Sequence, residues 1–170
     1  MREHVKYMLR ELYTKIQKKK EEGDGLLKKM LLSFSSNPGS QQRAIEGEQL
    51  HNTAAQFYNI GNFEKAFELY TSAIEKYPNA GSYYSRGVTA MDLNDYERAI
   101  ADFTSTIQFD KNYTNAYHNR ALCFLELLDS YDLMNETDCQ DLIDFARNDL
   151  KIAISLGHSG AKRFLDMSYE

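Results

Sequence analysis

The sequence predicts an all-α fold made of stacked helix pairs. Two observations lead there: segments of the chain repeat after 33 or 34 residues, and apolar residues within each segment recur at helical spacing. The composition agrees, because two prolines and nine glycines in 170 residues leave long stretches without a helix breaker. With 42% hydrophobic residues, the chain has enough apolar material for a core and is not expected to be disordered.

The chain aligns with itself in two places: residues 61–74 with 94–107, and residues 83–93 with 117–127. Each unit predicts two short helices joined by a tight turn, which Asn94 and Asp95 mark in the second unit. Small residues such as Gly87 and Ala99 are expected to let the paired helices approach closely, with large aromatic residues filling the remaining space.

These units resemble the tetratricopeptide repeat, a helix–turn–helix unit of about 34 residues. The family's small–aromatic–small–proline pattern is matched in the first unit by Ala66, Tyr70, Ala73 and Pro78. The resemblance implies a right-handed α-solenoid of about three repeats. We place the repeats at about 47–79, 80–113 and 114–157, within a domain of residues 41–170.

Two positions predict ion pairs between helices. Counted from each repeat start, position 7 is Arg86 in the second repeat and Arg120 in the third. Position 23 is Asp102 in the second repeat and, when the about 13 extra residues between the helices of the third repeat are left out, Asp149. The first repeat lacks both charges. We expect partly buried Arg–Asp pairs, within a repeat or to its neighbour, that serve the fold and not catalysis.

Two further segments follow the repeat pattern. Residues 158–168 predict a capping helix over the exposed face of the third repeat, since terminal units of a solenoid would otherwise expose core. The acidic insertion 129–144 holds six acids and no basic residue. It predicts a solvated loop and the start of a helix that Asp138 caps, or a surface for a basic partner. A calcium site is not expected, because the glycine and terminal glutamate of an EF-hand loop are missing.

Residues 1–40 predict an N-terminal helical extension and linker. An apolar stripe marks an amphipathic helix over residues 2–20, formed by Val5, Leu9, Leu12 and Ile16. A break at 22–25, a second helix from Leu26 to about Phe34 and a linker at 35–40 follow. Residues 1–30 hold nine Lys and Arg against five acids, whereas residues 31–170 hold eleven against twenty.

Three roles remain open for this extension. It can be a hairpin that packs on the first repeat or on another copy of the chain, a docking helix for a partner protein, or a membrane-surface helix. Lys18, Lys19 and Lys20 favour the last role, and four glutamates in residues 3–22 count against it. No transmembrane segment is expected, because no stretch approaches the roughly 20 apolar residues that a bilayer requires. No secretory signal is expected either.

The resemblance implies that the first helix of each repeat lines a concave groove that holds a partner peptide. The predicted partner-binding residues are His51, Asn52, Ala55, Tyr58, Asn59, Tyr84, Ser85, Val88, Met91, Asp92, Asn115, His118, Asn119, Leu122 and Glu126. Asparagine amides can match a peptide backbone, Tyr84 offers flat contact area, and Met91 gives an adaptable apolar floor. Asp92 and Glu126, with Glu48, favour a neutral or basic partner.

The best-known use of such a groove is to clamp the acidic C-terminal tail of heat-shock chaperones. That clamp needs Lys and Asn in the first repeat, Asn in the second, and Lys and Arg in the third. The corresponding residues here are His51, Ala55, Ser85, Asn115 and Asn119. No fixed cation remains, so binding of such tails is not expected.

No catalytic residue, cofactor or metal site is predicted. His51 and His118 are expected to lie about 20 Å apart, because neighbouring helices are about 10 Å apart. Cys123 lies on an apolar helix face and is assigned to the core, and Cys139 lies in an acidic segment that would raise its pKa. The acidic main body is a poor surface for nucleic acid. Two cysteines without a disulfide framework or metal-ligand spacing favour a cytoplasmic protein.

The sequence therefore predicts a non-catalytic interaction module, a scaffold or adaptor for a protein partner. The alternative is a structural subunit that self-associates through the N-terminal hairpin. The groove can also be filled by the chain's own hairpin, or hold no ligand. The sequence does not name the partner.

Overall fold

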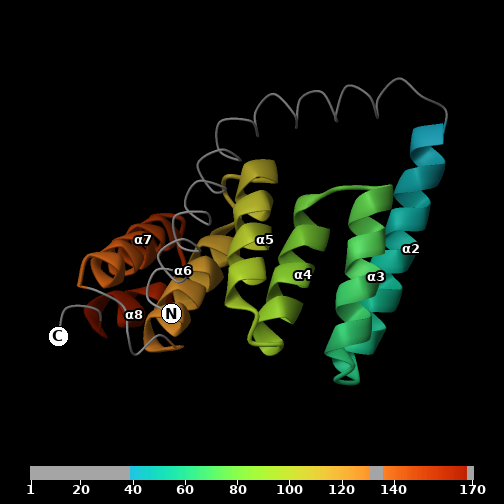
Figure 1. The fold of residues 1–170 in the computed structure, drawn as a ribbon. Helices are drawn as coiled ribbons and strands as arrows, with labels where there is room; N and C mark the ends of the chain where they lie inside the picture. Colours follow the sequence, from blue (N-terminus) through green and yellow to red (C-terminus); the bar gives the residue numbers. More distant parts are fainter. Residues whose placement is uncertain (1–38, 131–135, 168–170) are drawn as a thin grey trace.

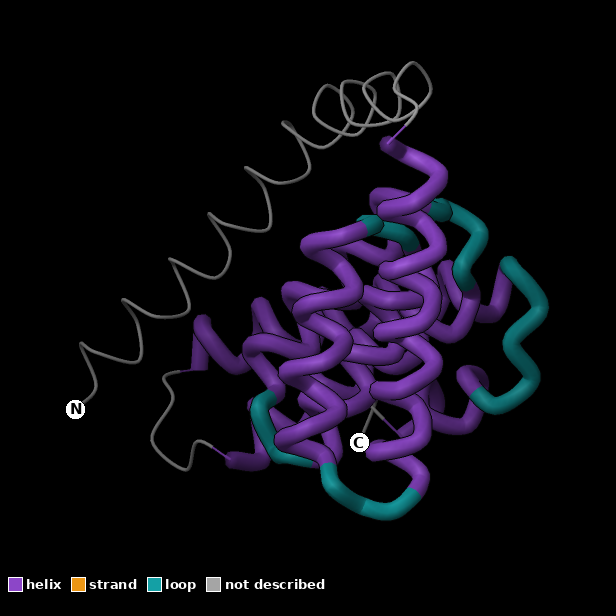
Figure 2. Tube along the Cα trace, turned by 90° about the vertical axis from the view of Figure 1, so that its right-hand side faces the viewer, coloured by secondary structure: helices purple, strands orange, loops and turns teal. Residues whose placement is uncertain are grey.

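The computed structural model describes residues 39–130 and 136–167, which form helices and no strand (Figures 1 and 2). The helices are α2 (Gly39–Asn59), α3 (Phe63–Lys76), α4 (Ala80–Asp92), α5 (Tyr96–Phe109), α6 (Thr114–Ser130), α7 (Glu136–Ser155) and α8 (Ala161–Met167). The predicted all-α class is confirmed. The N-terminal hairpin predicted within residues 1–34 lies outside the described residues.

The helices form three antiparallel pairs that stack in chain order. Helix α2 packs on α3, α4 on α5, and α6 on α7, while α3 and α5 each also contact the first helix of the next pair (Figure 1). Helix α8 packs on α7 in the place predicted for the cap. Each pair therefore buries one face against its own partner and another against its neighbour, as expected of a solenoid.

The turns inside the first two pairs share one local design. Gly61 and Asn94, 33 residues apart, both adopt a left-handed backbone, with φ of 78° and 57°. The next residue in each, Asn62 or Asp95, then caps the second helix with its side chain, which accepts from the backbone N–H three residues later. Glycine and asparagine are the residues that tolerate this conformation, so the turn chemistry repeats with the sequence.

Small residues let the paired helices approach, as predicted. Gly87 of α4 lies against α5 so closely that a Cβ there would stand 2.9 Å from Cε1 of Phe103. Ala99 and Phe103 of α5 are fully buried in the main core, which continues through α6 and α7 to Ala161 of α8. A side chain larger than hydrogen at position 87 would push the two helices apart.

Two predicted boundaries are wrong. Helix α2 begins at Gly39, so the last two residues of the predicted linker are helical, and the first helix starts eight residues before residue 47. The additional turns are held to α3 by Glu46, whose carboxylate lies 3.0 Å from Lys76 Nζ. Helix α7 begins at Glu136, so Asp138 lies inside its first turn and is not the residue that caps it. The division into an extension and a repeat domain stays a prediction.

Candidate functional site

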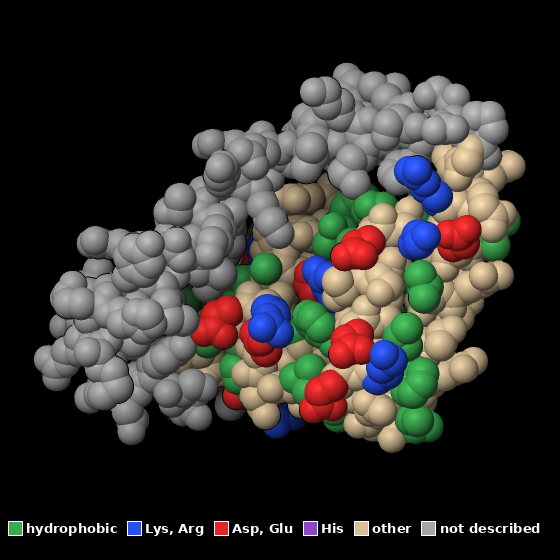
Figure 3. Space-filling view, turned by 45° about the vertical axis from the view of Figure 1, so that its right-hand side comes forward, with side chains coloured by type: hydrophobic (Ala, Val, Ile, Leu, Met, Phe, Trp, Pro, Cys, Tyr) green, Lys and Arg blue, Asp and Glu red, His purple; other side chains and the backbone are tan. Residues whose placement is uncertain are grey.

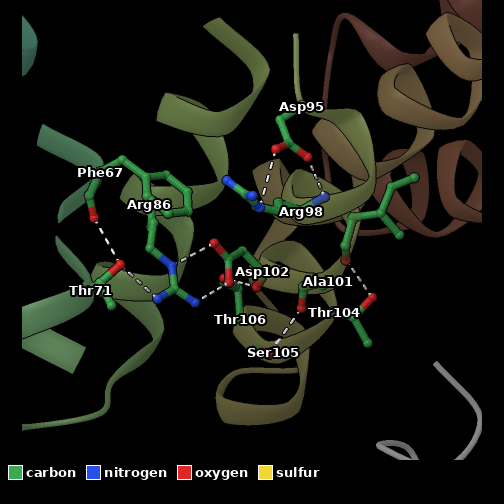
Figure 4. A network of polar contacts seen from close by, with 11 residues as sticks. Phe67, Thr71, Arg86, Asp95, Arg98, Ala101, Asp102, Thr104, Ser105 and Thr106 are labelled. Carbon is green, nitrogen blue, oxygen red and sulfur yellow. Dashed lines mark hydrogen bonds and ion pairs between the residues drawn. The ribbon is translucent and has the colours of Figure 1, made fainter. Parts of the chain in front are cut away.

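Arg86 joins three helices through one guanidinium group (Figure 4). From α4, its Nε and Nη2 donate to both carboxylate oxygens of Asp102 on α5, at 2.8 and 2.7 Å. Its Nη1 donates to the hydroxyl of Thr71 on α3, at 3.1 Å. The group thus ties the second repeat together and also joins it to the first. Bidentate pairing of this kind is the strongest geometry for an arginine and a carboxylate.

Arg120 of α6 repeats the arrangement one unit later. It holds Asp149 of α7 at 2.7 and 2.8 Å and donates to Thr104 of α5 at 2.9 Å. Asp149 is 2% exposed and the Arg120 side chain is 15% exposed. The predicted Arg–Asp pairs are confirmed. The threonine acceptors were missed, although Thr71 and Thr104 are identical in the internal alignment.

The predicted partner-binding residues lie on α2, α4 and α6, and we call this set the first-helix face. Its members differ in exposure. The exposed ones are Asn52, Asn59, Asp92, Asn115 and Glu126. The half-buried ones are His51, Ala55, Tyr58, Tyr84, Ser85, Val88, Met91, His118, Asn119 and Leu122. Apolar side chains are therefore the less accessible part of this set, and amides and carboxylates the more accessible part.

Hydrogen bonds cross this face from one first helix to the next. The phenol of Tyr58 on α2 donates to the Asp92 carboxylate on α4, at 2.6 Å. Between α4 and α6, Nδ2 of Asn119 donates to the Tyr84 hydroxyl at 3.1 Å. The hydrogen bond to Asp92 raises the pKa of Tyr58 to about 12, so this phenol remains neutral at physiological pH. The three first helices thus meet along one side of the stack.

These contacts divide the asparagines into two groups. Asn119 of α6 hydrogen-bonds Tyr84, and Oδ1 of Asn119 lies 3.2 Å from Nδ1 of His118. Asn115 also acts on the Tyr84 phenol. Asn52 and Asn59 of α2 are exposed. A carboxamide has two donors and two acceptor sites, so Asn119 keeps capacity for a ligand, but its orientation is already set by the fold.

Sequence reasoning missed a contact of His118. Its ring stacks on that of His158, in the connection between α7 and α8, with centroids 4.0 Å apart. The two residues are separated by 40 positions and His158 lies outside the repeated segments, so the sequence carried no signal of the contact. Burial lowers the pKa of His118 and also that of His51, which lies 3.1 Å from the Ser82 hydroxyl.

The described residues contain no group of three side chains suited to hold a metal ion. Cys123 is fully buried in the main core, and burial raises the pKa of its thiol, so the reactive thiolate is disfavoured. Among the described helices, none has the length and apolar character needed to cross a bilayer. On the face seen in Figure 3, acidic and basic side chains are interspersed. Lys65 and Glu68 form an exposed ion pair at 2.8 Å.

A family profile described as tetratricopeptide repeat matches residues 50–80, which span α2, α3 and the start of α4. This segment is a tetratricopeptide repeat, in a chain whose helix pairs stack one on the next.

The relatives of this chain share only part of their length with it. DnaJ homolog subfamily C member 7 of Mus musculus is 38% identical over 74 residues, which cover 41% of this chain and 15% of the relative. Serine/threonine-protein phosphatase 5 of Rattus norvegicus is 32% identical over 85 residues, 49% of this chain and 17% of the relative. The chain therefore spans less than a fifth of either relative.

Solved structures confirm the fold. The tetratricopeptide-repeat domain of Arabidopsis OM64 superposes with a TM-score of 0.64 at 22% identity, covering 75% of this chain and 97% of that one. The second such domain of human RPAP3, solved with the HSP70 peptide SGPTIEEVD, gives 0.62 at 22% identity and covers 76% and 98%. The first such domain of Spaghetti, bound to the HSP90 peptide SRMEEVD, gives 0.61 at 18% and covers 75% and 90%.

Proposed function

We propose that this protein is a non-catalytic scaffold or adaptor whose first-helix face binds a peptide or helix of a partner protein. Tetratricopeptide repeats are protein-interaction modules, so a binding role follows from the family. Our proposal adds a preference for a neutral or basic partner over an acidic one. It also includes a cytoplasmic location, which rests on the cysteine content.

The preference for a neutral or basic partner rests on one observation: both arginines of the first helices are already paired with aspartates. Arg86 and Arg120 are the basic side chains of α4 and α6, and each is held by a buried aspartate. Three carboxylates on the first helices are exposed instead, those of Glu48, Asp92 and Glu126. An acidic ligand would therefore meet carboxylates and no free guanidinium on α4 or α6, while a basic ligand would find complementary charge.

Two of the neighbouring folds were solved with chaperone peptides that end in EEVD. At the five positions of the chaperone-tail clamp, this chain has His51, Ala55, Ser85, Asn115 and Asn119. One of these, Asn119, hydrogen-bonds Tyr84, and none is a fixed cation. A ligand with several carboxylates would lose hydration without gaining paired charge, which opposes binding.

Isothermal titration with the peptide SRMEEVD tests this part of the proposal. We expect no binding tighter than about 1 mM at physiological salt. A five-residue variant that restores the clamp is the positive control and should gain affinity: His51→Lys, Ala55→Asn, Ser85→Asn, Asn115→Lys and Asn119→Arg. A dissociation constant below about 100 µM for the wild-type protein would contradict the charge argument.

Substitutions of exposed residues test the binding face itself. Asn119 is left unchanged in this test, because its hydrogen bond to Tyr84 means that replacing it could alter the fold as well as binding. The face variant is Asn52→Ala/Asp92→Asn/Glu126→Gln, and the matched control changes exposed residues on second helices, Glu75→Gln/Asp141→Asn. Each purified protein is immobilised, and proteins recovered from a lysate are compared and then titrated in pure form. The face variant should lose partner affinity at least tenfold and the control should not. Equal affinities for all three proteins would remove this face from the proposal.

A further inference from the structure

The connection between α7 and α8 is fastened to α6 through two histidine rings. His118 of α6 and His158 of this connection are nearly parallel, with 17° between their planes and 4.0 Å between their centroids. Phe164 of α8 meets the His118 ring edge-on at 5.4 Å. The first turn of the capping segment and the capping helix thus both rest on His118.

The ring nitrogens are arranged for neutral histidines. Nδ1 of His118 lies 3.2 Å from the Asn119 carbonyl oxygen, which fits an N–H donor at Nδ1. Nε2 of His118 and Nδ1 of His158 are buried and have no hydrogen-bond partner within the described part of the chain. Protonation would create a buried N–H at one of these atoms with no acceptor, and two charged rings at this distance would repel each other.

Among the residues that the structure describes, no neighbouring charge compensates for protonation of the His118 ring. The groups that act on the His118 ring are Asn119 and His158, apart from burial itself. The phenol of Tyr84 on α4 reaches it only through Asn119, and α8 adds the exposed basic residues Lys162 and Arg163. Other charged residues nearby are not among the groups that act on this ring: the exposed Asp110 and Lys111 of the α5–α6 connection, and the exposed Glu126 of α6.

The segment held by the stack is small. Helix α8 has seven residues, and its buried anchor is Ala161, with Phe164 and Leu165 packed at the edge of the main core. The connection before it is held by the backbone bond from His158 N to Ala153 O, 2.9 Å, and by a long bond of 3.5 Å from the Thr114 hydroxyl to Leu156 O. Segments with few buried contacts open at low free-energy cost.

We propose that the His118–His158 stack is a pH-sensitive latch, which releases α8 from α6 in mildly acidic solution and uncovers the third-repeat end of the first-helix face. Closure buries ring nitrogens of both histidines, and opening hydrates them. His118 is itself a member of the first-helix face, so the latch controls whether a partner can reach it. This inference does not depend on which partner the face binds.

The direction of the pH effect follows from burial. Burial lowers the pKa of His118 in the closed state, whereas a released, hydrated histidine has a pKa of about 6.5. The open state then binds more protons below about pH 6.5, so closure is fully favoured above that value and is lost progressively as the pH falls below it. Each unit of pKa difference changes the closing equilibrium about tenfold.

Hydrogen exchange on the full chain tests the latch. Amide protection in α8, corrected for the intrinsic pH dependence of exchange, is compared at pH 7.5 and pH 5.0 with protection in α4 and α5. We expect protection of α8 to fall at least tenfold in acid, while α4 and α5 change much less. The variant His118→Phe/His158→Phe keeps two stacked rings without titratable nitrogens and should make α8 protection independent of pH. His51→Gln, at a half-buried histidine away from α8, is the matched control and should behave as the wild type.

The outcomes separate the latch from a general acid effect. A second readout is the imidazole titration of His118 by NMR, whose pKa should be depressed in the wild type. The proposal is overturned if α8 protection in the wild type is the same at both pH values. It is also overturned if the double variant keeps the full pH dependence, because the histidines would then not be its source.

Discussion

Replacing Asp149 with asparagine should remove one of the main ties within the third repeat. The substitution keeps the shape of the side chain and removes the charge that faces Arg120. The pair is bidentate at 2.7 and 2.8 Å, and Asp149 is 2% exposed, so water cannot replace the lost carboxylate. Breaking a buried ion pair on one side costs about 3–5 kcal/mol, and the partial exposure of Arg120 places the expected loss near the lower end, about 3 kcal/mol.

Chemical denaturation followed by circular dichroism measures this loss. The matched control is Asp95→Asn, which removes the charge from a more exposed pair with Arg98 at 3.2 Å. Asparagine caps a helix as well as aspartate does, so this control should lose less than about 1 kcal/mol.

A third variant separates the charge from the packing. Arg120→Leu/Asp149→Leu removes both charges together and should recover much of the stability that Asp149→Asn loses, because no charge is left buried and unpaired. If Asp149→Asn unfolds at the same denaturant concentration as the control, the pair is not the tie that its geometry indicates. The conclusion that Arg86 and Arg120 stabilise the fold through their ion pairs would then fail.

Three further results are expected. Gly87→Ala should lower the free energy of unfolding by about 1–3 kcal/mol in the same assay, since its Cβ would stand 2.9 Å from the Phe103 ring; unchanged stability would contradict the close approach of α4 and α5. Asp92→Asn should lower the pKa of Tyr58 from about 12 toward 10, read as the ultraviolet phenol titration that Tyr58→Phe removes; an unshifted titration would place the cause elsewhere. Deleting residues 1–38 should turn a dimer into a monomer in light scattering if the N-terminal extension mediates self-association, and a monomer before and after deletion would disfavour that alternative.

The repeat architecture was predictable because its determinants are local and recur. Three features are properties of single segments and recur in the sequence: the spacing of Ala66 and Ala99, the turn residues after the first helices, and the matched Arg and Asp positions. The ion pairs followed from two positions that gain and lose charge together. Helix boundaries were less predictable, because the first turns of α2 lie before the repeated segments and have no counterpart in the internal alignment.

Contacts between distant segments decide which residues of the first-helix face are covered and which are already hydrogen-bonded. The sequence placed Tyr84, Asn119 and His118 on first helices, but periodicity assigns a residue to a face without saying what else reaches it. Distances between helices decided that Asn119 bonds Tyr84 and that His118 is covered by His158. The sequence by itself determined the stack of helix pairs and its internal ties, since these repeat with a fixed period. Only the tertiary structure decided which polar groups of the face are already paired, because hydrogen bonding and burial depend on atomic distances that no sequence period encodes.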